Sequence, residues 1–190
     1  MRRGARPIIK QRRRIFLGCE GESERSYGVR LHHLVELRHR RIHIDAVLLQ
    51  PGGGDPLAIV QRALDQMRDR TRKRGAYRAK AVLLDSDKLG QKPDRDTQAF
   101  ALAKQNGMLL ILQDSCHEAL ILRHLEDCSA LRPPSTKHAW DELTRRWPEY
   151  RKNMPALALA ARIDRTAVLR AAAAEANLRA FLVMIEFGED

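Results

Sequence analysis

Acidic side chains follow three short apolar segments of the chain. Glu20 comes directly after one such segment, Asp85 and Asp87 end or follow a second, and Glu118 lies shortly after a third. Carboxylates at close range repel one another and raise each other's pKa, so they are costly to bring together without a cation. Mg²⁺ binds through one or two carboxylates and keeps several of its waters. The pattern therefore indicates divalent-metal chemistry, with Mg²⁺ or Mn²⁺ as the expected cofactor.

Asp85 and Asp87 are two residues apart, where we expect a strand to end. Side chains alternate along a strand, so a spacing of two points both carboxylates to the same side, where they can face one ion. A single aspartate at such a position often does no more than stabilise a turn. The second aspartate, together with Glu20 at a separate strand end, favours a shared site.

Basic residues outnumber acidic ones, with 35 Lys and Arg against 24 Asp and Glu and a net charge of +11. Residues 1–14 carry seven basic side chains and no acid, and residues 62–80 carry eight against two acids. Such blocks attract polyanions, although a solvated arm and a solvated helix face would show the same pattern. We expect nucleic acid as the partner, bound at its phosphates by Arg12, Arg13, Arg14, Arg70, Arg72, Lys73 and Arg74.

Composition excludes several classes of protein. Hydrophobic residues make up 44% of the chain and charged residues 31%, which suits a globular domain rather than a disordered chain. The three cysteines lack the paired short spacing of a disulfide framework or a zinc knuckle. The basic N-terminus is not followed by a secretory apolar run, and no stretch approaches the about 18 apolar residues of a membrane span. We therefore expect a cytoplasmic protein with no membrane partner.

Short strand-like runs alternate with helical ones in the first two thirds of the chain. The periodicity predicts strands at 14–19, 42–49, 79–84 and 108–112, and helices at 24–38, from Pro56 onward, at 94–105 and at 118–125. Asp55 is expected to cap its helix, with Pro56 at the first helical position. Gly52, Gly53 and Gly54 lack the Gly-Lys-Ser/Thr of a P-loop and indicate a flexible turn.

Strands separated by helices predict a parallel sheet with helices on both faces, and such sheets bind ligands beyond the carboxyl ends of their strands. After Pro133 the strand signal fades, and three helical segments are expected, the last at 168–180. The predicted organisation is a basic arm at 1–13, an α/β core of about four strands at 14–130, and a helical part at 131–190 packed on the core.

The motifs, taken in order, resemble those of the RloB-like family of the Toprim superfamily. They are Cys19-Glu20-Gly21-Glu22-Ser23-Glu24, Gly54-Asp55-Pro56, Asp85-Ser86-Asp87 and the segment 115–124, and the resemblance spans about residues 14–154. It departs from the family at His117 and Leu120, where the family usually has Phe and Trp. The resemblance implies a Toprim (Rossmann-like) fold and a nuclease linked to restriction or phage-defence loci.

The resemblance also implies roles for single residues. Glu20 would act as general acid or base, Asp85 and Asp87 would hold Mg²⁺, and Glu24 and Glu118 would be additional acids. Glu118 has a structural alternative, because a carboxylate at the start of a helix is favoured by the helix dipole whatever the chemistry.

Two functions use these same charges. The first is metal-dependent attack of water on a phosphodiester of DNA or RNA, with Glu20 handling the proton. The second is a non-catalytic module that binds or senses nucleic acid or a small nucleotide through a metal-binding acidic cluster. Neither function requires or excludes a partner protein.

Overall fold

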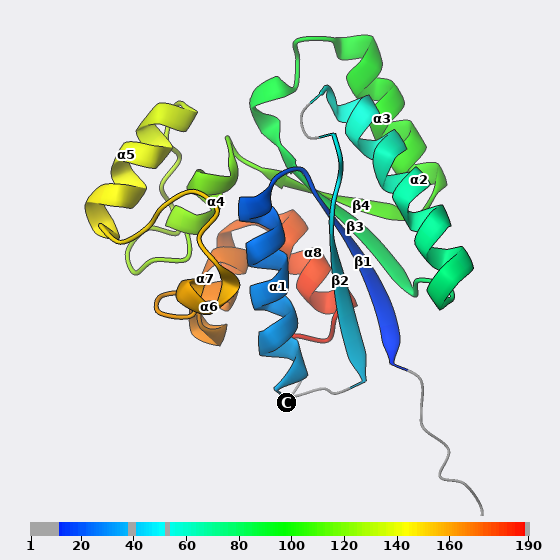
Figure 1. Ribbon diagram of the computed structural model, residues 1–190. Coiled ribbons are helices and arrows are strands. Elements are labelled where there is room, and N and C mark those ends of the chain that lie inside the picture. The colour runs from blue at the N-terminus through cyan, green and yellow to red at the C-terminus, as the bar shows by residue number, and fades with distance from the viewer. Residues whose placement is uncertain (1–11, 38–40, 52–53, 189–190) are drawn as a thin grey trace, which may run out of the picture.

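The computed structural model describes residues 12–37, 41–51 and 54–188. Four parallel strands form its sheet: β1 (Arg13–Cys19), β2 (Ile42–Leu48), β3 (Ala79–Asp85) and β4 (Met108–Gln113). Their spatial order is β2-β1-β3-β4 (Figure 1). The predicted α/β, Rossmann-like layout is confirmed, and each predicted strand agrees with the observed one to within one residue at either end.

Helices cover both faces of the sheet. The helices α2 (Pro56–Arg74) and α3 (Pro93–Gln105) lie on one face, and α1 (Glu22–Glu36) lies on the other (Figure 1). Consecutive residues of β1 belong to separate hydrophobic clusters, since Phe16 packs with α2 and α3 whereas Leu17 packs with α1. This alternation explains why the strands are apolar on both faces and polar only beyond their ends.

The start of α2 follows the predicted capping chemistry. Asp55 is the N-cap, its carboxylate accepts a hydrogen bond from the Ala58 backbone N–H at 3.0 Å, and Pro56 is the first helical residue. Arg95 of α3 donates from Nε to the same carboxylate at 2.6 Å. That hydrogen bond lowers the pKa of Asp55 to about 2, so the cap stays charged and links α2 to α3.

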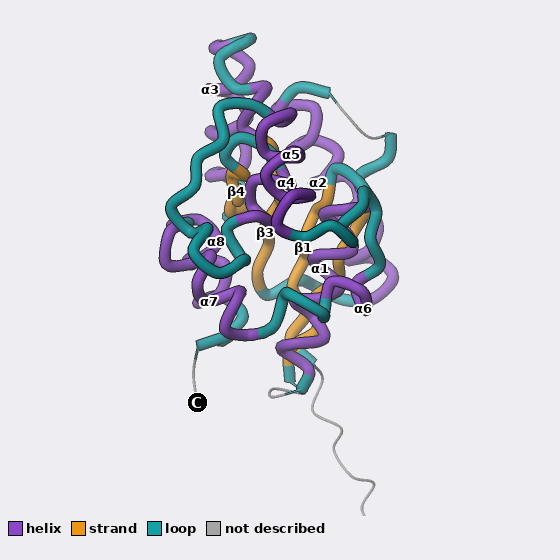
Figure 2. Tube along the Cα trace, turned by 90° about the vertical axis from the view of Figure 1, so that its left-hand side faces the viewer, coloured by secondary structure: helices purple, strands orange, loops and turns teal. Residues whose placement is uncertain are grey.

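Five shorter helices follow β4 and cover the α1 face. They are α4 (His117–Leu122), α5 (Thr136–Arg146), α6 (Ala156–Leu159), α7 (Arg165–Ala174) and α8 (Ala176–Met184). Trp147, Val168 and Phe181 from this part belong to the same hydrophobic cluster as Leu17 and Leu83 of the sheet. Figure 2 views the molecule from this side, with these helices in front of the strands.

Two helix predictions in this region are wrong. The segment predicted as one helix at 168–180 is divided between α7 and α8, and the break falls at Glu175. Arg123 and Arg132 bind the Glu175 carboxylate at 2.7 and 3.2 Å, a long-range contact that periodicity does not reveal. The helix predicted at 118–125 ends at Leu122, one residue before Arg123. Among the described residues, no helix has the length and apolar character needed to cross a membrane.

Candidate active site

The strand order gathers the predicted acids at the carboxyl edge of the sheet. β1 and β3 are neighbours, with Gly18 opposite Val82, so Glu20 and Asp85 leave adjacent strands. β3 and β4 are also neighbours, with Asp85 opposite Gln113, so the segment that carries Glu118 follows the next strand across. Three consecutive strands of the sheet therefore deliver carboxylates to one place.

Asp85 has the most altered ionisation among these acids. Burial first, and then the charges of four neighbouring carboxylates, together raise its pKa from 3.8 to about 8. The carboxylates contribute in the order Glu24, Asp87, Glu20 and Glu118. The other four acids singled out in the sequence thus lie within electrostatic reach of Asp85. Because like charges share this partly buried space, the site favours either a proton or a cation.

Two carboxylate oxygens at the site have no hydrogen-bond partner among the described residues. They are Oε2 of Glu20 and Oδ1 of Asp85, and both are buried. A buried oxygen without a partner is costly, because it has lost its water without gaining a donor. Both atoms are suitable ligands for a hard divalent cation.

Lys88 is a site residue that the sequence motifs did not single out. Its Nζ donates to Oε1 of Glu20 at 2.7 Å. Burial acts to lower the pKa of Lys88, but the hydrogen bond to Glu20 and the nearby carboxylates outweigh it, and the pKa is raised. Lys88 directly follows Asp87, and this neighbouring position is the feature of the sequence that could have identified it as a site residue.

Asp87 is positioned by a turn after β3 and not, as predicted, by the alternation of side chains along the strand. Asp85 ends β3, and the chain then turns into a 3-10 helix, η1 (Ser86–Lys88), so strand alternation does not extend to Asp87. The Asp87 backbone N–H donates to the Ser115 carbonyl at 3.1 Å, which ties this turn to the segment after β4. The Asp87 side chain is exposed, so the water ligands of a metal ion at this position could be in contact with solvent.

Glu24 has a structural role beside its place in the cluster. Its Oε2 accepts a hydrogen bond from the Gly21 backbone N–H at 3.1 Å, which closes the first turn of α1. A Cβ atom on Gly21 would lie 2.9 Å from that oxygen, so the turn fits glycine closely. Burial raises the pKa of Glu24. Glu24 therefore both fixes the start of α1 and adds a carboxylate beside Asp85.

Glu118 lies in the first turn of α4 and is 7% exposed. It lines a hollow of about 370 Å³ together with Trp140 and two lysines, Lys137 and Lys152. The pKa of nearby Tyr150 is raised, mainly by burial and secondly by the charge of Glu118. Glu118 thus lines a hollow of its own, and its charge also acts on Asp85, so its role is not limited to a helix-dipole contact.

The residues before Glu118 do not form a nucleophile and base. Burial raises the pKa of Cys116 and lowers that of His117 to about 4, so the thiol and the imidazole are both neutral near pH 7. His117 Nδ1 is hydrogen-bonded to Gln113 at 2.6 Å. This arrangement is a packed core.

Comparison with protein families gives a match over residues 15–181, to RloB-like protein. The chain belongs to the RloB-like family. No curated protein and no solved structure matches it. The family match covers every strand of the sheet apart from the first two residues of β1, and it includes all five acids of the cluster.

In the described part of this RloB-like chain, no three His, Cys, Asp or Glu side chains are already arranged as metal ligands. Two of the carboxylates are instead held by protein donors, Glu20 by Lys88 and Glu24 by Gly21. A bound ion would therefore take the free oxygen of Asp85 and draw in the exposed Asp87, with the free oxygen of Glu20 close by.

The basic residues predicted to bind nucleic acid lie toward the opposite, amino edge of the sheet. Several already have acidic partners: Arg12 pairs with Glu36, Arg13 with Glu186, Arg14 and Arg70 with Asp45, and Arg72 with Asp69. Lys73 and Arg74 are exposed in the last turn of α2. At about 3.3 Å per residue, a strand of this length separates the two edges by about 20 Å.

Arg14 differs from the other six basic residues. Its guanidinium donates to the Gly75 carbonyl at 2.6 Å, to Tyr77 Oη at 2.7 Å and to Asp45 at 2.9 Å. These contacts hold the start of β3 against β1 and leave Arg14 little capacity for phosphate. Residues 1–11 of the predicted arm, and Gly52 and Gly53 of the predicted turn, lie outside the described residues.

Proposed function

We propose that this RloB-like chain is a Toprim-type nuclease that cleaves phosphodiester bonds of nucleic acid with the help of Mg²⁺ or Mn²⁺. The observation that carries the proposal is the convergence of five carboxylates at one sheet edge, with the pKa of Asp85 raised to about 8 by burial and by its acidic neighbours. The resemblance to the RloB-like family implies a link to restriction or phage-defence loci, and we propose that setting for the activity.

The residues at the edge fit a divalent cation. Glu20 and Asp85 each keep a buried oxygen without a hydrogen-bond partner in the described structure, and Asp87 is exposed beside them. Asp85 and Asp87 would hold the ion. When bound, Mg²⁺ supplies positive charge that stabilises a phosphorane-like transition state and helps to activate water.

Glu20 is placed to take the proton of an attacking water. Its Oε1 is held by Lys88 at 2.7 Å, which fixes the side chain, and its Oε2 stays available. Lys88 is 34% exposed and can turn its ammonium toward a phosphate oxygen without leaving the site. Lys137 and Lys152, in the hollow beside Glu118, are placed to bind a neighbouring phosphate.

The Lys88–Glu20 ion pair favours a second candidate function, a non-catalytic module that binds or senses nucleic acid or a nucleotide. The ammonium neutralises the carboxylate that catalysis would need as a base. In that case the acidic cluster would bind metal and ligand without cleaving anything.

Cleavage assays with a single variant distinguish the two functions. Labelled single-stranded DNA, duplex DNA and RNA are incubated with the wild type and with Glu20→Gln, in Mg²⁺, in Mn²⁺ and in EDTA. The nuclease proposal expects metal-dependent cleavage that Glu20→Gln abolishes while binding is retained. Glu22→Gln is the matched control, because Glu22 is exposed and pairs only with Arg25 among the described residues, at 2.9 Å. Binding with no cleavage by the wild type in either metal would support the sensing module instead.

A further inference from the structure

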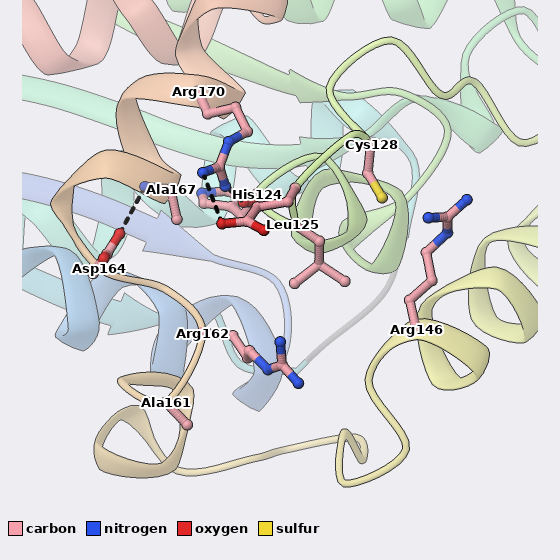
Figure 3. A pocket seen from close by; sticks show the side chains of 10 residues that line it. His124, Leu125, Cys128, Arg146, Ala161, Arg162, Asp164, Ala167 and Arg170 are labelled. Atoms are coloured by element: carbon pink, nitrogen blue, oxygen red, sulfur yellow. Dashed lines mark hydrogen bonds and ion pairs between the residues drawn. The ribbon is translucent and has the colours of Figure 1, made fainter.

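A second hollow lies away from the carboxylates. It has a volume of about 440 Å³ and opens where the chain leaves α4, between the end of α5 and the start of α7 (Figure 3). Glu118 lies at the other end of α4, in its first turn. At about 1.5 Å per residue, the four residues from Glu118 to Leu122 span about 6 Å along α4, and a turn over residues 123–125 leads on to this hollow.

Three arginines from separate elements line this hollow. Arg146 ends α5, Arg162 precedes α7 and Arg170 lies within α7, and Figure 3 shows them entering from different sides. Arg170 is fixed by a hydrogen bond to the His124 carbonyl, and Arg146 donates to Glu142 at 3.2 Å. The Arg162 side chain is exposed and makes no hydrogen bond or ion pair with any residue that the structure describes.

One of the two acids in the lining forms a long ion pair with one of these arginines, and the other caps a helix. Asp164 caps α7, accepting from the Ala167 backbone N–H at 2.8 Å, and also lies within electrostatic reach of Arg30. Glu126 is 89% exposed and is 4.0 Å from Arg170. Arg146 pairs with Glu142, which is outside the lining, and Arg162 has no ion pair among the described residues, so neither is paired with an acid of the lining.

We propose that this arginine pocket binds the phosphate groups of a nucleotide or a short oligonucleotide. Guanidinium groups pair with phosphate through two parallel hydrogen bonds, and three of them converge on one space here. The volume suits a ligand larger than a single phosphate, since ligand pockets run from about 300 to 1,000 Å³. No Phe, Tyr or Trp is among the described residues of the lining, so recognition is of phosphate rather than of the base.

This site is independent of the proposed cleavage chemistry. It contains none of the five clustered acids, and arginine–phosphate pairing needs no metal ion. Binding to it is therefore measurable in EDTA, where metal-dependent binding at the carboxylates does not contribute. A negative result for phosphate binding at this pocket would not contradict the proposed nuclease activity, and a lack of cleavage would not contradict binding at this pocket.

Isothermal titration calorimetry of the full chain in EDTA tests the site with three probes: inorganic pyrophosphate, ATP and a four-nucleotide DNA. Arg162→Gln and Arg146→Gln are each expected to weaken pyrophosphate binding by about ten-fold or more, given the strength of charge-assisted hydrogen bonds. Arg151→Gln is the matched control, because Arg151 is exposed in the same helical part and lies outside the lining. The Arg151→Gln variant should bind pyrophosphate with the affinity of the wild type.

Comparing the probes separates the two ligand sources. Tighter binding of ATP than of the tetranucleotide, lost in Arg162→Gln, assigns the pocket to a nucleotide, and the reverse order assigns it to a nucleic-acid strand. The proposal is overturned if the wild type binds none of the probes at millimolar concentration. It is equally overturned if Arg151→Gln weakens binding as much as the pocket variants do, because the effect is then one of overall charge.

Discussion

Asp85 is the residue at which burial and charge conflict most strongly. Its carboxyl group ends a buried strand, keeps one oxygen without a donor among the described residues, and is surrounded by four other acids. In the folded protein the pKa of Asp85 is raised to about 8, so its carboxyl group keeps a proton at lower pH. A cation in the same place would relieve the conflict without the proton. The ionisation of Asp85 is thus a direct reporter of how the cluster is neutralised.

The first prediction concerns this ionisation in metal-free buffer. The folded pKa of Asp85 is about 8, above its ordinary value of 3.8, so the folded state keeps a proton that the unfolded state loses. Stability should therefore fall as pH rises from about 4 to 8. Asp85→Asn should raise the free energy of unfolding at pH 8 by about 1 to 3 kcal/mol, because each pKa unit is worth about 1.4 kcal/mol and solvent screens part of the shift. It should change little at pH 4. Urea unfolding in EDTA checks this, and equal effects at both pH values would contradict it.

The second prediction concerns Lys88, which supplies the cationic charge beside Glu20. Without its ammonium, the carboxylates repel one another more strongly, so Lys88→Met should lower the melting temperature in EDTA at pH 8. Added Mg²⁺ should then stabilise the variant more than it stabilises the wild type, since the ion replaces the missing charge. Lys92→Met is the control, because Lys92 is 64% exposed and pairs with Asp55 at 3.8 Å, outside the cluster. The same Mg²⁺ shift in both variants would show that Lys88 has no special relation to the ion.

At the scale of elements, one buried arginine joins segments that are distant in sequence. The Arg123 guanidinium is fully buried, donates to the carbonyl groups of Asp114 and Leu131, and pairs with Glu175 at 2.7 Å. It therefore connects the end of β4, the segment before α5 and the junction of α7 with α8. Asp114 directly precedes Ser115, whose carbonyl anchors the Asp87 turn, so this arginine also supports the position of the carboxylates.

The third prediction follows from that connection. Arg123→Met should lower the free energy of unfolding by about 3 to 5 kcal/mol, because it leaves the Glu175 carboxylate half-buried without its main partner. Arg132→Gln removes the exposed partner of the same carboxylate and should cost less than about 1 kcal/mol. Chemical denaturation of both variants measures the difference. Equal losses would mean that the Arg123 pair does not hold these elements together.

The sequence predicts the elements well because their signals are local. Alternating and continuous apolar runs locate all four strands, and the Asp55-Pro56 pair locates the start of α2. Strand order depends on contacts between distant segments, so the residues favoured a shared site for Glu20 and Asp85 but did not establish that their strands are neighbours. The break at Glu175 and the ion pair of Lys88 with Glu20 also depend on tertiary contacts. They have no counterpart in periodicity or spacing.

At the scale of the whole molecule, charge is divided between two edges of one sheet. Acids converge at the carboxyl edge, whereas Lys73, Arg74 and the other predicted phosphate-binding residues lie about 20 Å away, toward the amino edge. At about 3.4 Å per base pair, a nucleic acid must extend over about six base pairs to reach both edges. For the proposed nuclease, the amino-edge residues are thus suited to holding a long substrate and not to contacting the phosphate that would react.

The fourth prediction tests that division. The double variant Lys73→Gln/Arg74→Gln should weaken duplex binding and flatten its dependence on salt, by about 0.9 in the log–log slope for each phosphate that the protein no longer neutralises. Cleavage at saturating substrate should be unchanged, because neither residue is near the carboxylates. Fluorescence anisotropy at several salt concentrations measures the slope. An unaltered slope would show these side chains to be part of a solvated helix face.

The central claim is that the clustered carboxylates hold a divalent cation, and Mn²⁺ binding followed by electron paramagnetic resonance tests it most directly. We expect a Mn²⁺ site in the wild type, and we expect Asp85→Asn and Asp87→Asn each to weaken its affinity by about ten-fold or more. Glu22→Gln, at an exposed acid outside the cluster, should bind Mn²⁺ as the wild type does. A wild type that binds no Mn²⁺ at millimolar concentration would contradict a metal site at the carboxylates, as would aspartate variants that both bind Mn²⁺ as tightly as the wild type.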